Sequence, residues 1–116
     1  MNYEITAPEL ASLLMEASSN SANAASKPVV LLDVREAWEV SVSAISGHIH
    51  MAMGEIPSRA HQEIDPDAHI VAYCHLGMRS LSVAHWLREQ GFESAQSLAG
   101  GIDAWSAQID PAVPRY

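Results

Sequence analysis

The chain has one cysteine, Cys74, and the residues around it predict a nucleophile at the end of a strand. It follows His69–Tyr73, an apolar run typical of a buried strand, and precedes a helical pattern over 79–90 that ends at Gly91. At the carboxyl edge of a parallel sheet, loop N–H groups and helix N-termini converge where ligands bind. Such groups stabilise a thiolate, the nucleophilic form of cysteine. Gly77 allows the loop to turn with consecutive N–H groups pointing inward, as in an anion-binding nest.

Four residues lie between Cys74 and Arg79, and this spacing distinguishes two kinds of chemistry. Cysteine phosphatases have one residue more between the cysteine and the arginine, because their loop wraps a tetrahedral phosphate. We expect the shorter ring to fit a terminal sulfur on the cysteine, a persulfide, better than a phosphoryl group. We therefore predict that Cys74 is the catalytic residue and that the loop binds the substrate through His75, Leu76, Gly77, Met78 and Arg79.

The cysteine loop is one of several segments that match a known family. The segments are Leu31–Glu36 with Trp38-Glu39, then Ser46–Ile49, Tyr73–Ser80 and Leu98–Trp105. In their order and spacing they resemble the rhodanese (thiosulfate sulfurtransferase) family, in its single-domain form. One departure is that the family continues with Pro-Gly-Ala after Gly-His-Ile, whereas this chain has His50-Met51-Ala52. This departure concerns the local turn and not the cysteine loop.

The resemblance implies a sulfurtransferase without a metal or an organic cofactor. Cys74 would take a sulfane sulfur from thiosulfate or from a persulfidated protein or small thiol, and hold it as a persulfide. The acceptor would be cyanide or a thiol, of a thioredoxin-like or glutathione-like kind. Two alternatives stay open: a non-catalytic binding module with the same fold, and a cysteine phosphatase or arsenate reductase. The short loop and the lack of a second cysteine oppose the latter.

Several residues near the predicted loop are candidates for supporting roles. Asp33 and Arg35 follow the apolar run Val29–Leu32, so they are expected at the same edge of the sheet as Cys74. Asp33 is predicted to accept backbone N–H bonds that hold the loops together, and Ser80 to cap backbone groups of the cysteine loop. Arg35 is predicted to bind substrate by adding positive potential beside Cys74, and the alternative is that it pairs with a carboxylate such as Glu39.

The charge of Arg79 needs a partner because a cation in the first turn of a helix opposes the helix dipole. We predict that Arg79 divides its role between an anionic ligand and a carboxylate partner, with three candidates for the latter, Asp33, Glu36 and Glu39. His75 is predicted either to help bind the substrate or to be a solvent-facing loop residue.

The remaining histidines and the tryptophans suggest structural roles. His48 and His50 have the spacing of two residues on one face of a strand, but the sequence offers no third ligand with defined spacing, so we predict no metal site. The family resemblance makes His48 part of a structural turn. Trp38 is expected to line the opening beside Cys74, whereas Trp86 and Trp105 are expected in or near the core.

Length and composition limit the class of protein. A chain of 116 residues with 48% hydrophobic content fits one domain, over residues 1–116, with a single core. The net charge of −8 argues against binding to nucleic acid or to anionic membrane surfaces. It also predicts weak turnover of thiosulfate relative to a neutral or protein-bound persulfide. A cytoplasmic location is expected, because the sequence shows neither a secretion signal nor an apolar segment near the ~18 residues that span a bilayer.

The remaining pattern alternates short strands and helices, which predicts an α/β fold. We expect a three-layer sandwich, in which helices cover both faces of a mostly parallel sheet of about five short strands. Thr6-Ala7-Pro8-Glu9 has the form of a capping box and begins a helix to about Ala17. The other predictions are an edge strand at 3–5, a loop at 18–26, helices at 36–43, 54–62 and 100–108, a return to the sheet at 45–49, a turn at 65–67 and a last strand at 95–98.

Overall fold

The structure, a computed structural model described over residues 2–19 and 28–116, contains one five-stranded sheet in the order β1-β5-β4-β2-β3. All four strand pairs are parallel. The strands are β1 (Glu4–Ile5), β2 (Val29–Asp33), β3 (Ile49–His50), β4 (His69–Tyr73) and β5 (Ala95–Leu98). The helices are α1 (Ala7–Ser19), α2 (Ala37–Val42), α3 (Ile56–Glu63), α4 (Met78–Glu89) and α5 (Gly101–Gln108), with a 3-10 turn, η1, at Met53–Glu55. The predicted α/β sandwich is confirmed.

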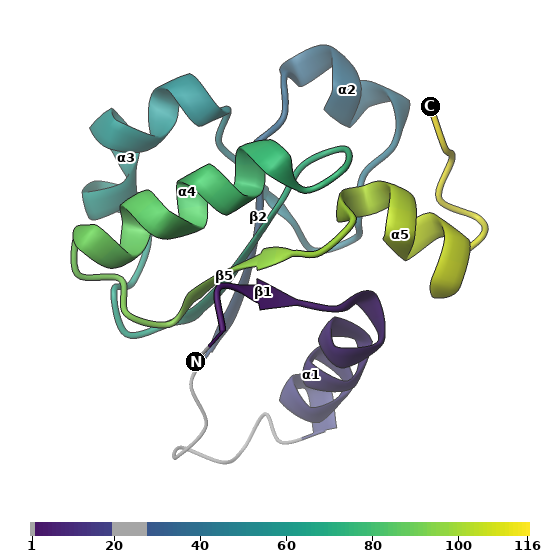
Figure 1. The fold of residues 1–116 in the computed structure, drawn as a ribbon, viewed down its shortest axis with the longest axis horizontal. Coiled ribbons are helices and arrows are strands. Elements are labelled where there is room, and N and C mark those ends of the chain that lie inside the picture. The colour runs from purple at the N-terminus through teal and green to yellow at the C-terminus, as the bar shows by residue number, and fades with distance from the viewer. Residues whose placement is uncertain (1, 20–27) are drawn as a thin grey trace.

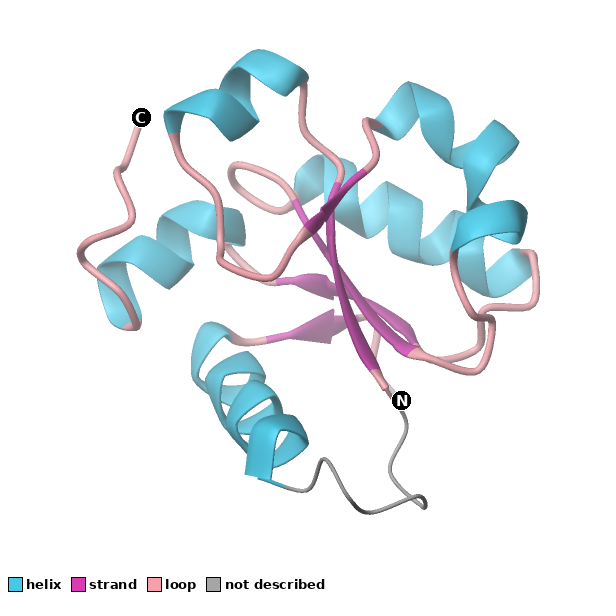
Figure 2. Ribbon diagram, turned by 180° about the vertical axis from the view of Figure 1, so that it is seen from behind, coloured by secondary structure: helices cyan, strands magenta, loops and turns pink. Residues whose placement is uncertain are grey.

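The side chains of β4 alternate between two hydrophobic clusters, one on each face of the sheet. Ile70 and Ala72 pack in the first cluster, and Val71 and Tyr73 pack in the second. The first cluster includes Ile56 and Ala60 of α3 with Val83 and Leu87 of α4, and the second includes Ala7 and Leu10 of α1 with Ile102 and Trp105 of α5. Figures 1 and 2 show the resulting layers, with α3 and α4 on one side of the sheet and α1 and α5 on the other.

A local signal in the sequence accounts for the start of α1. The predicted capping box is present: the Thr6 N–H donates to Glu9 Oε1 at 2.9 Å, and the Glu9 N–H donates to Thr6 Oγ1 at 3.2 Å. The predicted loop at 18–26 begins later than expected, because residues 18 and 19 belong to α1, and residues 20–26 lie outside the described part of the chain.

No helix within the described ranges is long and apolar enough to cross a bilayer.

The segment that departs from the family pattern continues alongside the sheet. His50 pairs with Asp33 of β2, and the Met51 N–H then donates to the Asp33 carbonyl oxygen at 2.9 Å. The side chain of Met51 is completely buried in the first cluster. Methionine suits this position because its flexible, unbranched side chain fills an irregular space in a core.

Candidate functional site

Cys74 follows the last residue of β4, and its sulfur is surrounded by hydrogen-bond donors. Sγ accepts the N–H of Gly77 at 3.1 Å and the N–H of Ser80 at 3.5 Å, and the Ser80 hydroxyl lies 3.4 Å from it. Gly77 has a φ of +110° at the N-cap of α4, a conformation that glycine adopts without strain. The first turn of α4 is thereby directed at the sulfur, so Sγ lies among N–H donors at the N-terminal end of this helix.

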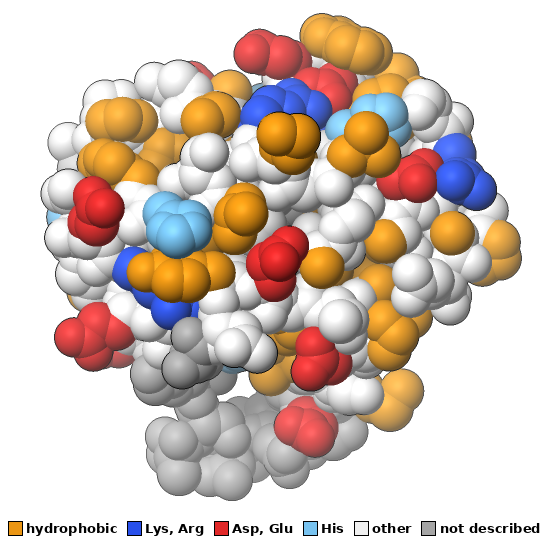
Figure 3. Space-filling view, in the orientation of Figure 1, with side chains coloured by type: hydrophobic (Ala, Val, Ile, Leu, Met, Phe, Trp, Pro, Cys, Tyr) orange, Lys and Arg blue, Asp and Glu red, His pale blue; other side chains and the backbone are white. Residues whose placement is uncertain are grey.

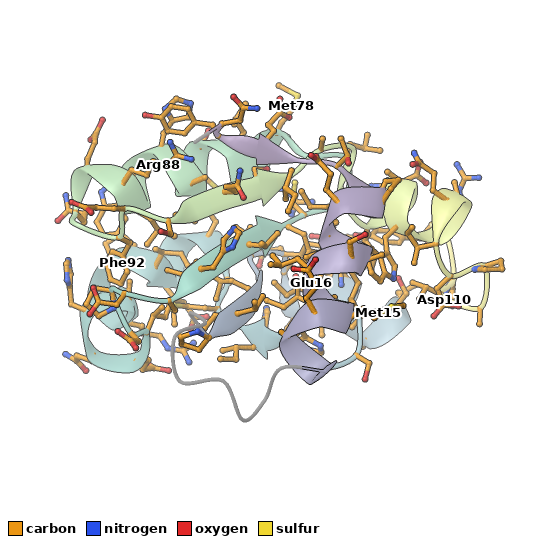
Figure 4. The ribbon with its side chains drawn as sticks, turned by 90° about the horizontal axis from the view of Figure 1, so that it is seen from below. Met15, Glu16, Met78, Arg88, Phe92 and Asp110 are labelled. Atoms are coloured by element: carbon orange, nitrogen blue, oxygen red, sulfur yellow. The ribbon has the colours of Figure 1, made fainter. Side chains whose placement is uncertain are left out.

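Cys74 also lines a surface pocket of about 200 Å³, here called the Cys74 pocket. Its lining residues are Cys74, His75, Leu76, Met78 and Arg79. Of these residues, Cys74 is 1% exposed, whereas Leu76 and Met78 are 62% and 84% exposed. The side chain of Met78 projects from the molecule in Figure 4. Figure 3 shows hydrophobic, acidic, basic and histidine side chains close together over α2 and the loop before α4.

Arg79 is held by Glu39, one of the three carboxylates considered as its partner. Arg79 Nη1 and Nη2 lie 2.7 and 2.9 Å from Glu39 Oε1 and Oε2, a two-pronged ion pair between α4 and α2. The Glu39 carboxylate is nearly buried, and its Oε1 also accepts the N–H of Glu36 at 3.1 Å. The hydrogen bonds from Arg79 lower the pKa of Glu39 to about 2, although burial opposes this shift.

The start of α5 holds the cysteine loop from behind. The N–H groups of Ile102 and Asp103 donate to the carbonyl oxygens of Cys74 and His75 at 2.9 and 3.2 Å. Gly101 makes this approach possible, because a Cβ at this position would lie 2.5 Å from the Cys74 carbonyl oxygen. Its φ of +60° also favours glycine. The turn at Gly100-Gly101, which is distant in the sequence, therefore contacts and supports the strand–loop–helix unit around Cys74.

Comparison with known proteins identifies the family. A family model described as a rhodanese-like domain matches residues 16–108, which is most of the chain. This chain belongs to the rhodanese-like family.

Relatives within the rhodanese-like family include proteins named as sulfurtransferases. The putative sulfurtransferase YtwF of Bacillus subtilis is 38% identical over 87 residues, covering 75% of this chain and 82% of YtwF. The thiosulfate sulfurtransferase GlpE of Coxiella burnetii is 32% identical over 81 residues, covering 70% of this chain and 75% of GlpE. The solved structure of the human single-domain sulfurtransferase TSTD1 aligns with a TM-score of 0.73 and 25% identity, covering 93% of this chain and 98% of that one.

Some relatives are longer than this rhodanese-like chain. A rhodanese-like/PpiC domain-containing chloroplastic protein of Arabidopsis thaliana is 34% identical over 89 residues. The match covers 74% of this chain and only 30% of that protein. The sequence-based assignment to the rhodanese-like family is confirmed by the family match, and its sulfurtransferase kind is supported by the names of these relatives.

Arg35 does not lie in the Cys74 pocket, so the prediction that it binds substrate there is wrong. The side chain is completely buried and makes a two-pronged contact with Asp33, through Nε at 3.0 Å and Nη2 at 2.7 Å. Nη2 also donates to the carbonyl oxygen of Ser43 at 2.6 Å. The physical reason is that the buried Asp33 carboxylate, two residues away, needs a cation beside it. Asp33 Oδ1 also accepts the backbone N–H of Arg35 at 3.0 Å, so it orders the loop after β2.

Tyr116 and Ser97 are part of the site and were missed in the sequence. The ring of Tyr116 stacks on His75, with ring centres 4.1 Å apart. The Ser97 hydroxyl of β5 lies 2.7 Å from the Ser80 hydroxyl, the group that contacts Cys74 Sγ. Neither residue lies within the segments that match the family, and each reaches the site only because of the order of the strands and the path of the chain after α5.

The histidines and tryptophans considered in the sequence analysis lie outside the lining of the Cys74 pocket, apart from His75. Nδ1 of His48 and Nε2 of His50 hydrogen-bond to backbone carbonyl oxygens at 2.9 and 2.7 Å. Over residues 2–19 and 28–116, no three His, Cys, Asp or Glu side chains come together as a group that could hold a metal ion. Trp38 is 62% exposed and lies edge-on to Tyr116, next to the Cys74 pocket but outside its lining. Trp105 is buried and Trp86 packs against the first cluster, as expected.

The buried ion pair of Arg35 gives a prediction about stability. Replacing Arg35 by lysine is expected to lower the free energy of unfolding by about 2 kcal/mol, because one ammonium group cannot make the two-pronged contact with Asp33 and also reach Ser43. Urea unfolding measures the change. Arg59→Lys is the control, since Arg59 pairs with Glu55 and Glu63 at the surface, and it should leave the unfolding midpoint unchanged. Equal losses in the two variants would contradict the prediction.

The ion pair of Glu39 gives a prediction about pH. A carboxyl group whose pKa is lowered on folding stabilises the protein when ionised, so its contribution is complete above pH 4.5 and is lost as the pH falls towards 2. We expect Glu39→Gln to lower the free energy of unfolding by about 2 kcal/mol at pH 7. The difference from the unsubstituted protein, measured by urea unfolding, should shrink below pH 4.5 and approach zero near pH 2. A difference that is constant over this range would refute the assignment.

Proposed function

We propose that this rhodanese-like chain is a sulfurtransferase that carries sulfane sulfur on Cys74. The observation that carries the proposal is the set of donors around Sγ of Cys74, a residue that lines the Cys74 pocket: the N–H groups of Gly77 and Ser80 and the Ser80 hydroxyl. Donors fixed in this way stabilise a sulfur anion, both as the thiolate and as the terminal sulfur of a persulfide. The names of its relatives support the same kind of reaction.

The proposed reaction has two displacement steps. The Cys74 thiolate attacks the outer sulfur of thiosulfate, the bond between that sulfur and the sulfonate breaks, and sulfite leaves with the electron pair. A persulfide anion remains on Cys74, so charge is balanced and no external oxidant is needed. In the second step a thiolate or cyanide attacks the terminal sulfur, and the Cys74 thiolate leaves with the electrons of the sulfur–sulfur bond. A persulfide donor reacts in the same way, with its own thiolate as the leaving group.

The charges around the Cys74 pocket favour a donor other than free thiosulfate. Among the five residues that line the pocket, only Arg79 carries a formal positive charge, and Glu39 neutralises it. Arg35 is buried with Asp33 and does not contribute. We therefore expect a lower kcat/KM for thiosulfate than for a persulfidated protein donor, measured with the same acceptor. A kcat/KM for thiosulfate that equals or exceeds that of the protein donor would contradict this expectation.

The proposed function is tested by mass spectrometry of the Cys74 peptide. After incubation with a sulfane donor, the peptide should gain the mass of one sulfur, and subsequent treatment with a thiol or with cyanide should remove it. Hydrolysis of a chromogenic phosphate ester serves as the control for the phosphatase alternative and should not be catalysed. A peptide that never gains sulfur would leave the binding-module alternative standing and would end the proposal.

A further inference from the structure

Tyr116 contacts His75 directly and Arg79 through Glu39, and both His75 and Arg79 line the Cys74 pocket. Its ring covers one face of His75, with ring planes 12° from parallel. Its hydroxyl donates to Glu39 Oε2 at 2.6 Å, and Glu39 in turn holds Arg79. In Figures 1 and 2 the segment after α5 turns back and runs towards α2, which brings Tyr116 to this position. One side chain outside the pocket lining therefore contacts one lining residue directly and another through a carboxylate.

The hydrogen bonds give the Tyr116 hydroxyl a fixed direction. Arg35 Nη1 donates to the hydroxyl oxygen at 2.9 Å, so the hydroxyl proton points to Glu39. Glu39 Oε2 then has two donors, Tyr116 and Arg79 Nη2, while Oε1 has Arg79 Nη1 and the Glu36 N–H. A carboxylate with both oxygens occupied in this way is held in the orientation that suits a two-pronged contact with arginine.

We infer that Tyr116 is a positioning residue that keeps Arg79 paired with Glu39 and so sets the preference of the Cys74 pocket for uncharged or protein-borne reactants over small anions. The inference rests on the proposed function where it concerns the choice of sulfur donor. Arg79 is the residue whose freedom matters, because its side chain is 37% exposed and lines the pocket. When the carboxylate loses the tyrosine donor, the ion pair loosens and the guanidinium gains access to an anion beside Cys74.

Alkylation of Cys74 tests the inference without any sulfur transfer. Iodoacetate is an anion and iodoacetamide is uncharged, and the Cys74 thiolate displaces iodide from both, so the ratio of their rate constants reports the charge near the sulfur. Tyr116→Phe keeps a ring to stack on His75 and removes the hydroxyl. We expect it to raise the ratio of the iodoacetate to the iodoacetamide rate constant by about threefold. Tyr116→Leu, which also removes the ring, should raise the ratio by at least as much.

The control is Tyr3→Phe, which removes a hydroxyl from an aromatic residue stacked on His85, away from the Cys74 pocket, and should leave the ratio unchanged. A purely structural role for Tyr116 predicts that both reagents change in parallel, so an unchanged ratio in Tyr116→Phe and Tyr116→Leu overturns the inference. If the ratio rises as expected and Cys74 also forms a persulfide, kcat/KM for thiosulfate should rise by a similar factor. A rise in the ratio without persulfide formation would support the positioning role and count only against the proposed function.

Discussion

Replacement of Cys74 by serine is expected to abolish persulfide formation and to reduce sulfur transfer by about 10³-fold or more. The serine hydroxyl is not ionised at neutral pH, and it cannot form the sulfur–sulfur bond that holds the transferred atom. The side chain is nearly isosteric with cysteine, so the donors from Gly77 and Ser80 still have an acceptor and the fold should be kept. Transfer is measured as sulfur delivered to cyanide or to a thiol.

Two further measurements make the Cys74→Ser result specific. Thermal unfolding of the variant should match that of the unsubstituted protein within a few degrees, which separates loss of the nucleophile from loss of the fold. Ser80→Ala removes the hydroxyl beside Sγ and leaves the two N–H donors, so it should lower transfer only about tenfold. Substantial transfer by Cys74→Ser would place the reacting sulfur elsewhere and would remove the basis of the proposed function.

Replacement of Gly101 by alanine is expected to have the largest effect on stability, a loss of about 2–5 kcal/mol, and to reduce sulfur transfer at least about a hundredfold. The added Cβ would meet the backbone carbonyl groups of Cys74 and His75, which cannot rotate away as a side chain can. The cysteine loop must then shift and lose its hydrogen bonds from Ile102 and Asp103. Urea unfolding and the rate of sulfur transfer measure the two effects.

Two other glycines separate the causes of the Gly101→Ala effect. Gly47 has a φ of +87°, and no heavy atom of the described residues lies within 4 Å of the place that a Cβ would take, so Gly47→Ala should cost only about 1 kcal/mol of backbone strain. Gly54 has neither a positive φ nor a described atom within 4 Å, so Gly54→Ala should have no measurable effect. If Gly101→Ala lowers the free energy of unfolding no more than Gly47→Ala does, close packing of α5 against the cysteine loop is not the reason for glycine at position 101.

The central unit of the site was predictable because its signals are local. The buried strand before Cys74, the turn at Gly77 and the helix after it follow from residues within one stretch of the sequence. The observed helix starts at Met78, one residue before the predicted start at Arg79, and ends at Glu89. The alternation of strands and helices was also sufficient to predict the parallel sheet, because parallel strands need a crossover connection between them.

The role of each charged side chain was harder to predict, because the sequence does not show which side of the backbone faces the interior. Arg79 had three candidate carboxylates in the sequence, and only the position of α2 over the start of α4 selects Glu39. Arg35 follows β2 at the edge that carries Cys74, as expected, but its side chain turns inward to a buried carboxylate. The cost of burying the Asp33 carboxylate without a cation decides this orientation.

The sequence by itself determined the cysteine loop, its place between a strand and a helix, and the class of fold, because these depend on local periodicity and on the spacing of a few residues. Only the tertiary structure decided that Ser97, Glu39 and Tyr116 complete the site and that Arg35 does not belong to it. The contacts of Ser97, Glu39 and Tyr116 join residues far apart in the chain, whereas Arg35 pairs with Asp33, two residues away. They depend on the strand order, on the docking of α5 and on the need of each buried charge for a partner, none of which is encoded by spacing alone.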